Sequence, residues 1–153
     1  MTPYLTEADL RAAIVAEFLS WEGTPYHHLG DVKGREGGVD CAMILVRGFQ
    51  NLELLPADLD PRPYPIDWHV HRDIERYLLQ VSEHAKETDG PPQPGDVRLY
   101  KFGRTFSHSA VVIEWPMVIH AFMRDRMVVR ADETKFPLAG REAKTYTMWE
   151  ARI

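Results

Sequence analysis

Apolar residues recur at helical spacing in two stretches of the N-terminal third of the chain. The first stripe consists of Leu10, Ala13, Ile14, Phe18 and Trp21, and it follows Thr6 and Asp9, which have the spacing of a capping box. The second stripe consists of Ala42, Leu45, Val46, Phe49 and Leu52, with Asp40 at the N-cap position. The pattern predicts one helix from Thr6 to the stop at Gly23, and a second from Cys41 to about Asn51.

The segments around these stretches contain strong helix breakers. Residues 29–39 hold four glycines and several charges, so we expect a flexible loop that leads to Cys41. Residues 56–67 hold four prolines, which predict an extended, helix-free crossing. A third helix is expected from about Val70 to Ala85. Its core face would consist of Ile74, Tyr77, Leu78 and Val81, and the Pro- and Gly-rich residues 89–96 would follow it.

The second half of the chain changes from a helical to a strand-like period. Five short runs are typical of strands, and they span residues 97–102, 109–115, 118–123, 127–130 and 146–151. Helices followed by a meander of antiparallel strands predict an α+β fold, with helices packed on one face of a small sheet or open barrel. We expect residues 1–153 to form a single domain, because this length suffices for one substantial core.

Composition and charge narrow the range of functions. A net charge of −5 argues against a nucleic-acid surface, which needs a basic stripe. The first residues lack the basic and apolar regions of a secretory signal, and no apolar run approaches the roughly 20 residues that span a bilayer. We therefore expect a protein that is made in the cytoplasm and has no membrane span. The single cysteine excludes an internal disulfide.

That cysteine, Cys41, stands at the first position of the second predicted helix. Unpaired backbone N–H groups and the positive end of the helix dipole favour a thiolate there, and a thiolate is a strong nucleophile. A nucleophilic cysteine needs a base, which is usually a histidine. The alternative is a buried, inert cysteine that packs as a small hydrophobic residue.

Two histidines lie in predicted strands, where a catalytic base would be held rigidly. His108 and His120 are both flanked by apolar residues, many of them β-branched. The alternative is that both are ordinary sheet histidines. The remaining histidines lack the spacing of known metal motifs, so we expect neither a metal nor another cofactor.

The even separation of His108 and His120 allows a test of their pairing. Paired residue numbers in an antiparallel hairpin have a constant sum, and the two histidines share a face only if that sum is even. A three-residue loop at 114–116 gives a sum of 230 and places the histidines diagonally, within hydrogen-bonding reach. A two-residue loop separates them unless a bulge resets the register. We predict the odd loop or an equivalent bulge.

Five short motifs then occur in an order that is typical of one enzyme family. They are Gly23-Thr24-Pro25-Tyr26, Gly38-Val39-Asp40-Cys41, Pro94-Gly95-Asp96-Val97, His108-Ser109-Ala110-Val111-Val112-Ile113 and Ile119-His120-Ala121. Together they span most of the chain and resemble the NlpC/P60 family of papain-like cysteine peptidases. Three further features resemble the members encoded in phage tail modules: Tyr26-His27-His28, the Lys-Gly loop before the cysteine, and Asp67-Trp68-His69.

The resemblance implies a role for each matched residue. Cys41 would be the nucleophile, His108 the base, and His120 the residue that orients the imidazole of His108. Tyr26 would help to bind the oxyanion or the substrate. Asp40 would contact the substrate, since this position holds the substrate's amino group in some members. The implied mechanism has Cys41 and His108 resting largely as an ion pair.

The implied function is hydrolysis of peptide bonds in the stem peptides of peptidoglycan, by a phage tail or prophage component. Phage tail proteins are then candidate partners, and a tail or another carrier would deliver the protein to the cell wall. Ala42 and Met43 stand where the family usually has Ser and Gly, so the family's exact substrate preference does not carry over. Two alternatives stay open: another papain-like amidase of the antibacterial effector type, and a non-catalytic structural protein of a tail assembly.

Overall fold

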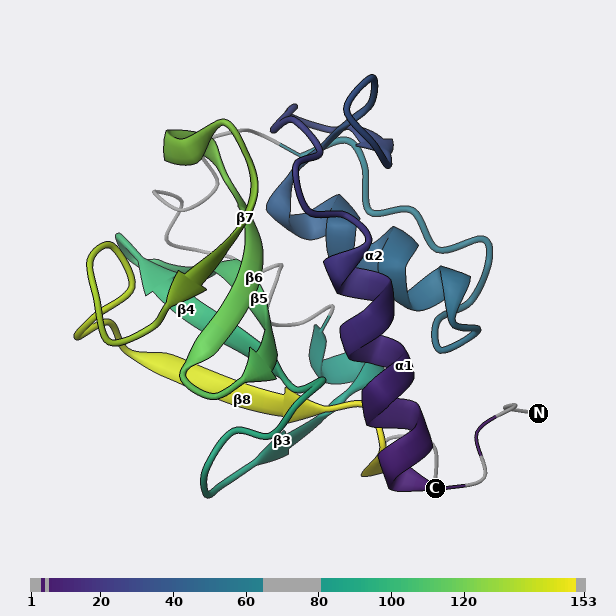
Figure 1. Ribbon diagram of the computed structural model, residues 1–153, viewed down its shortest axis with the longest axis vertical. Coiled ribbons are helices and arrows are strands. Elements are labelled where there is room, and N and C mark those ends of the chain that lie inside the picture. The colour runs from purple at the N-terminus through teal and green to yellow at the C-terminus, as the bar shows by residue number, and fades with distance from the viewer. Residues whose placement is uncertain (1–3, 5, 65–80, 151–153) are drawn as a thin grey trace.

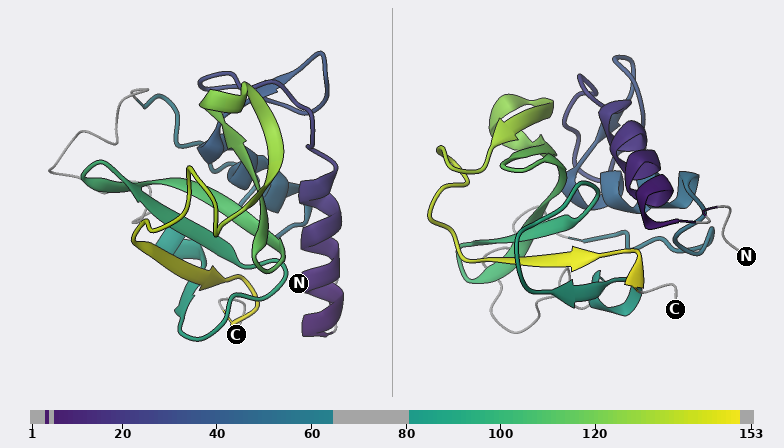
Figure 2. Two further views of the ribbon diagram at one scale, coloured as in Figure 1. Left: turned by 60° about the vertical axis from the view of Figure 1, so that its left-hand side comes forward. Right: turned by 60° about the horizontal axis from the view of Figure 1, so that its bottom comes forward.

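The structure is a computed structural model that describes residues 4, 6–64 and 81–150. Within these residues, two helices precede a six-stranded antiparallel sheet, which confirms the predicted α+β class. Helices α1 (Glu7–Leu19) and α2 (Cys41–Asn51) contact each other and lie on the same side of the sheet (Figures 1 and 2). No helix in the described ranges is long and apolar enough to cross a bilayer.

Both predicted N-caps are present, and they fix where the helices begin. The side chains of Thr6 and Asp40 each accept a hydrogen bond from the backbone N–H three residues later, at 3.1 and 2.9 Å. The apolar stripes of the two helices meet where the ring of Phe18 lies 4.9 Å from the ring of Phe49. The sequence pattern therefore predicted both helices and the faces that they bury.

The sheet has the strand order β3-β8-β4-β5-β6-β7. Its strands are β3 (Lys86–Thr88), β4 (Val97–Phe102), β5 (Thr105–Glu114), β6 (Met117–Phe122), β7 (Met127–Asp132) and β8 (Ala143–Thr147), and the short 3-10 helix η2 (Met123–Asp125) precedes β7. Strands β4 to β7 form the predicted meander. The last strand does not continue it, because β8 crosses back and pairs with β4.

One predicted strand lies at a different position in the structure, and one strand of the structure was not predicted. The last strand spans 143–147 instead of 146–151, because its first residues are positioned by pairing with β4 and not by an apolar pattern of their own. Strand β3 was not predicted, since its three residues are polar and are placed only by pairing with β8.

The Gly-rich segment before Cys41 is more regular than the predicted loop. Its strands β1 (Asp31–Val32) and β2 (Gly38–Val39) form an antiparallel pair. Gly37 makes this possible, because a Cβ there would lie 2.1 Å from the carbonyl oxygen of Val32. The third predicted helix lies mostly outside the described residues, although residues 81–84 are helical.

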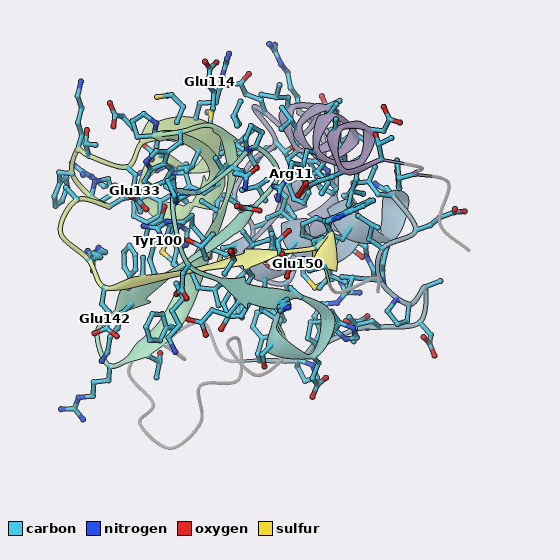
Figure 3. All side chains as sticks on the ribbon, turned by 90° about the horizontal axis from the view of Figure 1, so that it is seen from below. Arg11, Tyr100, Glu114, Glu133, Glu142 and Glu150 are labelled. Atoms are coloured by element: carbon cyan, nitrogen blue, oxygen red, sulfur yellow. The ribbon has the colours of Figure 1, made fainter. Side chains whose placement is uncertain are left out.

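The sheet has an apolar core on each of its faces. The larger core lies between the sheet and the helices, and the smaller one includes Tyr100, Val112 and Leu138. Tyr100 pairs with His108 across β4 and β5, so their side chains share the smaller-core face. Figure 3 shows Tyr100 within the sheet layer and Glu142 at its periphery, near the start of β8.

Candidate active site

Strands β5 and β6 bring His108 and His120 together. Val111 pairs with Ile119, so the paired numbers sum to 230 as predicted. The turn itself has two residues, and a bulge at Ile113 resets the register before it. The Nε2 atom of His108 lies 2.8 Å from the Nδ1 atom of His120. The predicted hydrogen bond between the rings is confirmed, through a bulge instead of an odd loop.

Burial keeps both rings neutral. His108 and His120 are 6% and 1% exposed. Burial lowers the pKa of His120 to about 4, against a smaller opposite effect of Asp125. Burial is also the largest cause that holds the pKa of His108 well below its usual range, and the neighbouring His120 and Arg141 lower it further. At neutral pH the two rings therefore share a single proton at their contact.

The position of that proton decides whether His108 can act as a base. When Nε2 of His108 carries it, Nδ1 of the same ring is unprotonated and able to accept a proton. His120 is then an acceptor at Nδ1 and carries a hydrogen on Nε2. That buried Nε2 atom has no hydrogen-bond partner in the described part of the chain. His120 thus orients His108 without competing for its basic nitrogen.

An aromatic wall, made of Tyr100, Phe102 and Phe122, surrounds the ring of His108. The rings of Phe102 and Phe122 lie edge-on to it, with centroids 5.2 and 5.1 Å away. Phe122 also stacks on His120 at 5.0 Å. These contacts restrict the rotamers of both histidines and keep water from the shared proton.

The thiol of Cys41 lies where β6 has stopped pairing with β5. Pairing of β5 with β6 runs from the turn back to Val111. Further along β5, the thiol of Cys41 donates to the carbonyl oxygen of Ser107 at 3.7 Å, and the N–H of Ser109 donates to the sulfur. The hydroxyl of Ser109 also donates to the carbonyl oxygen of Cys41 at 3.0 Å. Since these serines flank His108, the thiol lies beside β5 at the level of that histidine.

The electrostatics of this position differ from the expected resting state. Burial raises the pKa of the Cys41 thiol, and the negative charge of Asp40 raises it further, against smaller effects of backbone N–H groups. The lowered pKa of His108 acts in the same direction. Both pKa shifts favour a neutral thiol and a neutral imidazole over the expected resting ion pair. Desolvation outweighs the helix N-terminus here.

The carboxylate of Asp40, the residue before the nucleophile, forms hydrogen bonds with three segments of the chain. Besides capping α2, its 2%-exposed carboxylate accepts the N–H of Leu29 at 2.8 Å. It also accepts the hydroxyl of Tyr64, 2.8 Å from one oxygen and 2.7 Å from the other. Nδ1 of His28 lies 3.7 Å from the same carboxylate. Asp40 therefore positions the loop before Cys41, and its predicted contact with substrate stays a prediction.

Tyr26 lies beside the nucleophile with its hydroxyl available. Its backbone bridges Val39 in β2, two residues before Cys41. Burial raises the pKa of Tyr26, and the neighbouring Cys41 and Asp40 raise it further, so the hydroxyl keeps its proton. That hydroxyl makes no hydrogen bond to the described residues. It can donate to an oxyanion, as the resemblance implies.

Several features of the site were not visible in the sequence. Tyr64 lies in the proline-rich crossing, whose composition predicts only an extended chain, and its bond to Asp40 depends on the tertiary fold. The contacts of Ser107 and Ser109 are mainly backbone contacts, which residue type does not signal. Met43, by contrast, could be expected to pack inside from its apolar side chain, and it is fully buried. In the described ranges, no cluster of three His, Cys, Asp or Glu side chains could hold a metal.

Alkylation of Cys41 by iodoacetamide is expected to be slow at neutral pH and to accelerate as the pH rises past the ordinary thiol range. Only the thiolate reacts, and a raised pKa keeps the thiolate rare, so we expect a rate at least about tenfold below that of a free exposed thiol at pH 8. Asp40→Asn removes a charge that raises this pKa and should speed labelling, whereas Asp58→Asn, an exposed control, should not. Rapid labelling at pH 6 would contradict this account.

The comparisons with known proteins bear on the fold. No family model and no curated protein matches the chain. Among solved structures, NlpC1 from Trichomonas vaginalis has a TM-score of 0.66 at 16% identity over 94% of this chain. The NlpC/p60 domain of the peptidoglycan hydrolase SagA has a TM-score of 0.56 at 18% identity over 88% of this chain. The peptidoglycan hydrolase RipB from Mycobacterium tuberculosis has a TM-score of 0.59 at 17% identity over 94% of this chain.

These matches define the class of fold. The chain has the papain-like α+β fold of NlpC/P60 structures, with N-terminal helices packed on an antiparallel sheet. It spans 45% of the length of the Trichomonas protein, 96% of the SagA domain and 68% of RipB. At these identities the likeness concerns the fold alone.

Proposed function

We propose that this chain is a cysteine hydrolase that cleaves peptide bonds in the stem peptides of peptidoglycan. The observation that supports it most is that Cys41 bonds to Ser107 and Ser109, the two neighbours of His108 in β5, while His108 bonds to His120. Two of the proteins with a similar fold are described as peptidoglycan hydrolases, which supports the choice of substrate.

In the proposed mechanism, the neutral thiol is activated only as it reacts. Nδ1 of His108 removes the thiol proton while the sulfur attacks the scissile carbonyl. His120 accepts a hydrogen bond from the Nε2–H group of the imidazolium that forms. The backbone N–H of Cys41 and the hydroxyl of Tyr26 stabilise the oxyanion, and one such donor is typically worth about 3 kcal/mol. His108 then protonates the leaving amine, and water releases the acyl group from Cys41.

We further propose that a phage tail or a comparable carrier delivers this catalytic domain, residues 1–153, to the cell wall. The Tyr26-His27-His28 run and the Asp67-Trp68-His69 segment resemble phage tail-module members, which supports this route. The Asp67 segment lies outside the described residues. A purely structural tail protein is disfavoured, because a scaffold has no physical need for the bond between His108 and His120.

Digestion of purified peptidoglycan tests this function. Wild-type protein is expected to release soluble fragments, and mass analysis should find new amino and carboxyl termini within the stem peptides. Release of intact stems from the sugar strands would indicate the amidase alternative. No release above the level of Cys41→Ala would contradict both enzymatic functions and favour the structural alternative.

A further inference from the structure

Arg141 is a half-buried cation beside the proposed catalytic histidine. It lies just before β8, and its guanidinium carbon is 3.5 Å from the centroid of Phe102, a member of the aromatic wall. The ring of Phe102 in turn lies 5.2 Å from that of His108. In Figure 1 the end of β4 and the start of β8 both lie on the left. The charge of Arg141 is close enough to lower the pKa of His108.

The guanidinium of Arg141 is positioned by the chain but not neutralised by it. Its Nε donates to the carbonyl oxygen of Pro137 at 2.7 Å, and its Nη1 reaches that of Lys101 at 3.4 Å. No carboxylate of the described residues forms an ion pair with it. Two other arginines that link separate segments do form ion pairs with carboxylates. Arg11 pairs with Asp96 at 2.7 Å, and Arg98 pairs with Glu133 at 2.6 Å.

Two lysines lie in the adjoining parts of β4 and β8. Lys101 and Lys144 are half-buried at the ends of β4 and β8, and the amine of Lys144 lies 4.9 Å over the ring of Phe106. Neither lysine has an ion pair within the described part of the chain. Glu142 is the nearest acid in sequence, and it is exposed at the periphery (Figure 3).

We propose that Arg141 binds a carboxylate of the substrate and thereby determines specificity, an inference that rests on the proposed hydrolase function. A guanidinium matches a carboxylate in geometry, and stacking on Phe102 fixes its plane. His108 protonates the leaving amine, so groups around its ring contact the leaving half of the substrate. Because one aromatic ring separates Arg141 from His108, the carboxylate belongs to the residue that follows the scissile bond.

The test compares synthetic stem peptides that differ at one group. One peptide has a free carboxylate on the residue after the scissile bond, a second has a carboxamide there, and a third has a carboxamide in the acyl half instead. Binding is measured by titration of the Cys41→Ala protein, and kcat/KM is measured with the active protein. The variants are Arg141→Gln, Arg141→Lys and the control Arg124→Gln, which removes another arginine that stacks on a phenylalanine.

We expect the first peptide to bind about 10- to 100-fold more tightly than the second, which is the usual range for a charge-assisted contact. Arg141→Gln should abolish this preference by weakening only peptides with the free carboxylate, Arg141→Lys should keep part of it, and Arg124→Gln should keep all of it. An equal loss for all peptides would mean that Arg141 only supports its loop, and would overturn the proposal. So would a preference that survives Arg141→Gln, or the absence of binding of any peptide to the Cys41→Ala protein with Arg141 intact.

The two readouts separate this inference from the proposed function. If the preference appears in binding but no peptide is hydrolysed, the hydrolase function fails while the role of Arg141 stands. If the first two peptides are hydrolysed with equal kcat/KM, the hydrolase function stands while the role of Arg141 fails.

Discussion

His108→Ala is expected to reduce hydrolysis of peptidoglycan by at least about 10³-fold without unfolding the protein. The raised pKa of the Cys41 thiol favours its neutral form, so the proposed mechanism needs a base that removes the thiol proton during attack, and it assigns that role to His108. The measurement is the rate of fragment release at pH 7, with near-ultraviolet circular dichroism to verify the fold.

Two further histidine variants serve as comparisons. His120→Ala should leave an intermediate rate, because in the proposed mechanism His120 orients the base without touching the reacting atoms. Loss of such a supporting contact typically costs roughly 10- to 100-fold. His27→Ala should leave the rate near that of wild type, since this side chain is exposed. If His108→Ala retained more than a tenth of the wild-type rate, His108 would not be the base.

Asp40→Ala is expected to lower the free energy of unfolding by about 3 kcal/mol or more. It removes an N-cap, worth about 1 kcal/mol, and it leaves the N–H of Leu29 and the hydroxyl of Tyr64 without their acceptor, at about 1–3 kcal/mol each. Such a loss is large for a domain whose total stability is typically about 5–15 kcal/mol. Urea denaturation followed by circular dichroism measures it as a lower midpoint.

A graded series isolates the role of the Asp40 carboxylate. Asp40→Asn keeps a capping oxygen and should cost less than Asp40→Ala, while Asp58→Ala, at an exposed position, should change the unfolding free energy by less than about 0.5 kcal/mol. Equal midpoints for Asp40→Ala and wild type would show that Asp40 does not hold these segments together.

The sequence was most informative where local rules and tertiary structure agree. The caps at Thr6 and Asp40 and the two apolar stripes predicted both helices, because these signals act within one turn of chain. The even separation of His108 and His120 in the sequence predicted their contact, because successive side chains of a strand point to alternate faces in any surroundings. The bulge at Ile113 that achieves this register was foreseen only as one of two solutions.

The sequence was least informative where distant segments decide the outcome. The position of Cys41 at a helix N-terminus suggested an activated thiolate, but burial raises the pKa of the thiol. The bond from Tyr64 to Asp40 and the return of β8 to β4 likewise depend on contacts between distant positions. Arg141 gave no signal, because its stack on Phe102 arises only when β8 pairs beside β4.

The rate of peptidoglycan hydrolysis by Cys41→Ala, relative to wild type, tests the central claim most directly. Cys41 is the only cysteine in the chain, so no other thiol can replace it. The account predicts that wild type releases stem-peptide fragments and that Cys41→Ala, with an unchanged circular dichroism spectrum, releases them at least about 10³-fold more slowly. A rate within tenfold of wild type would contradict the assignment of Cys41 as the nucleophile.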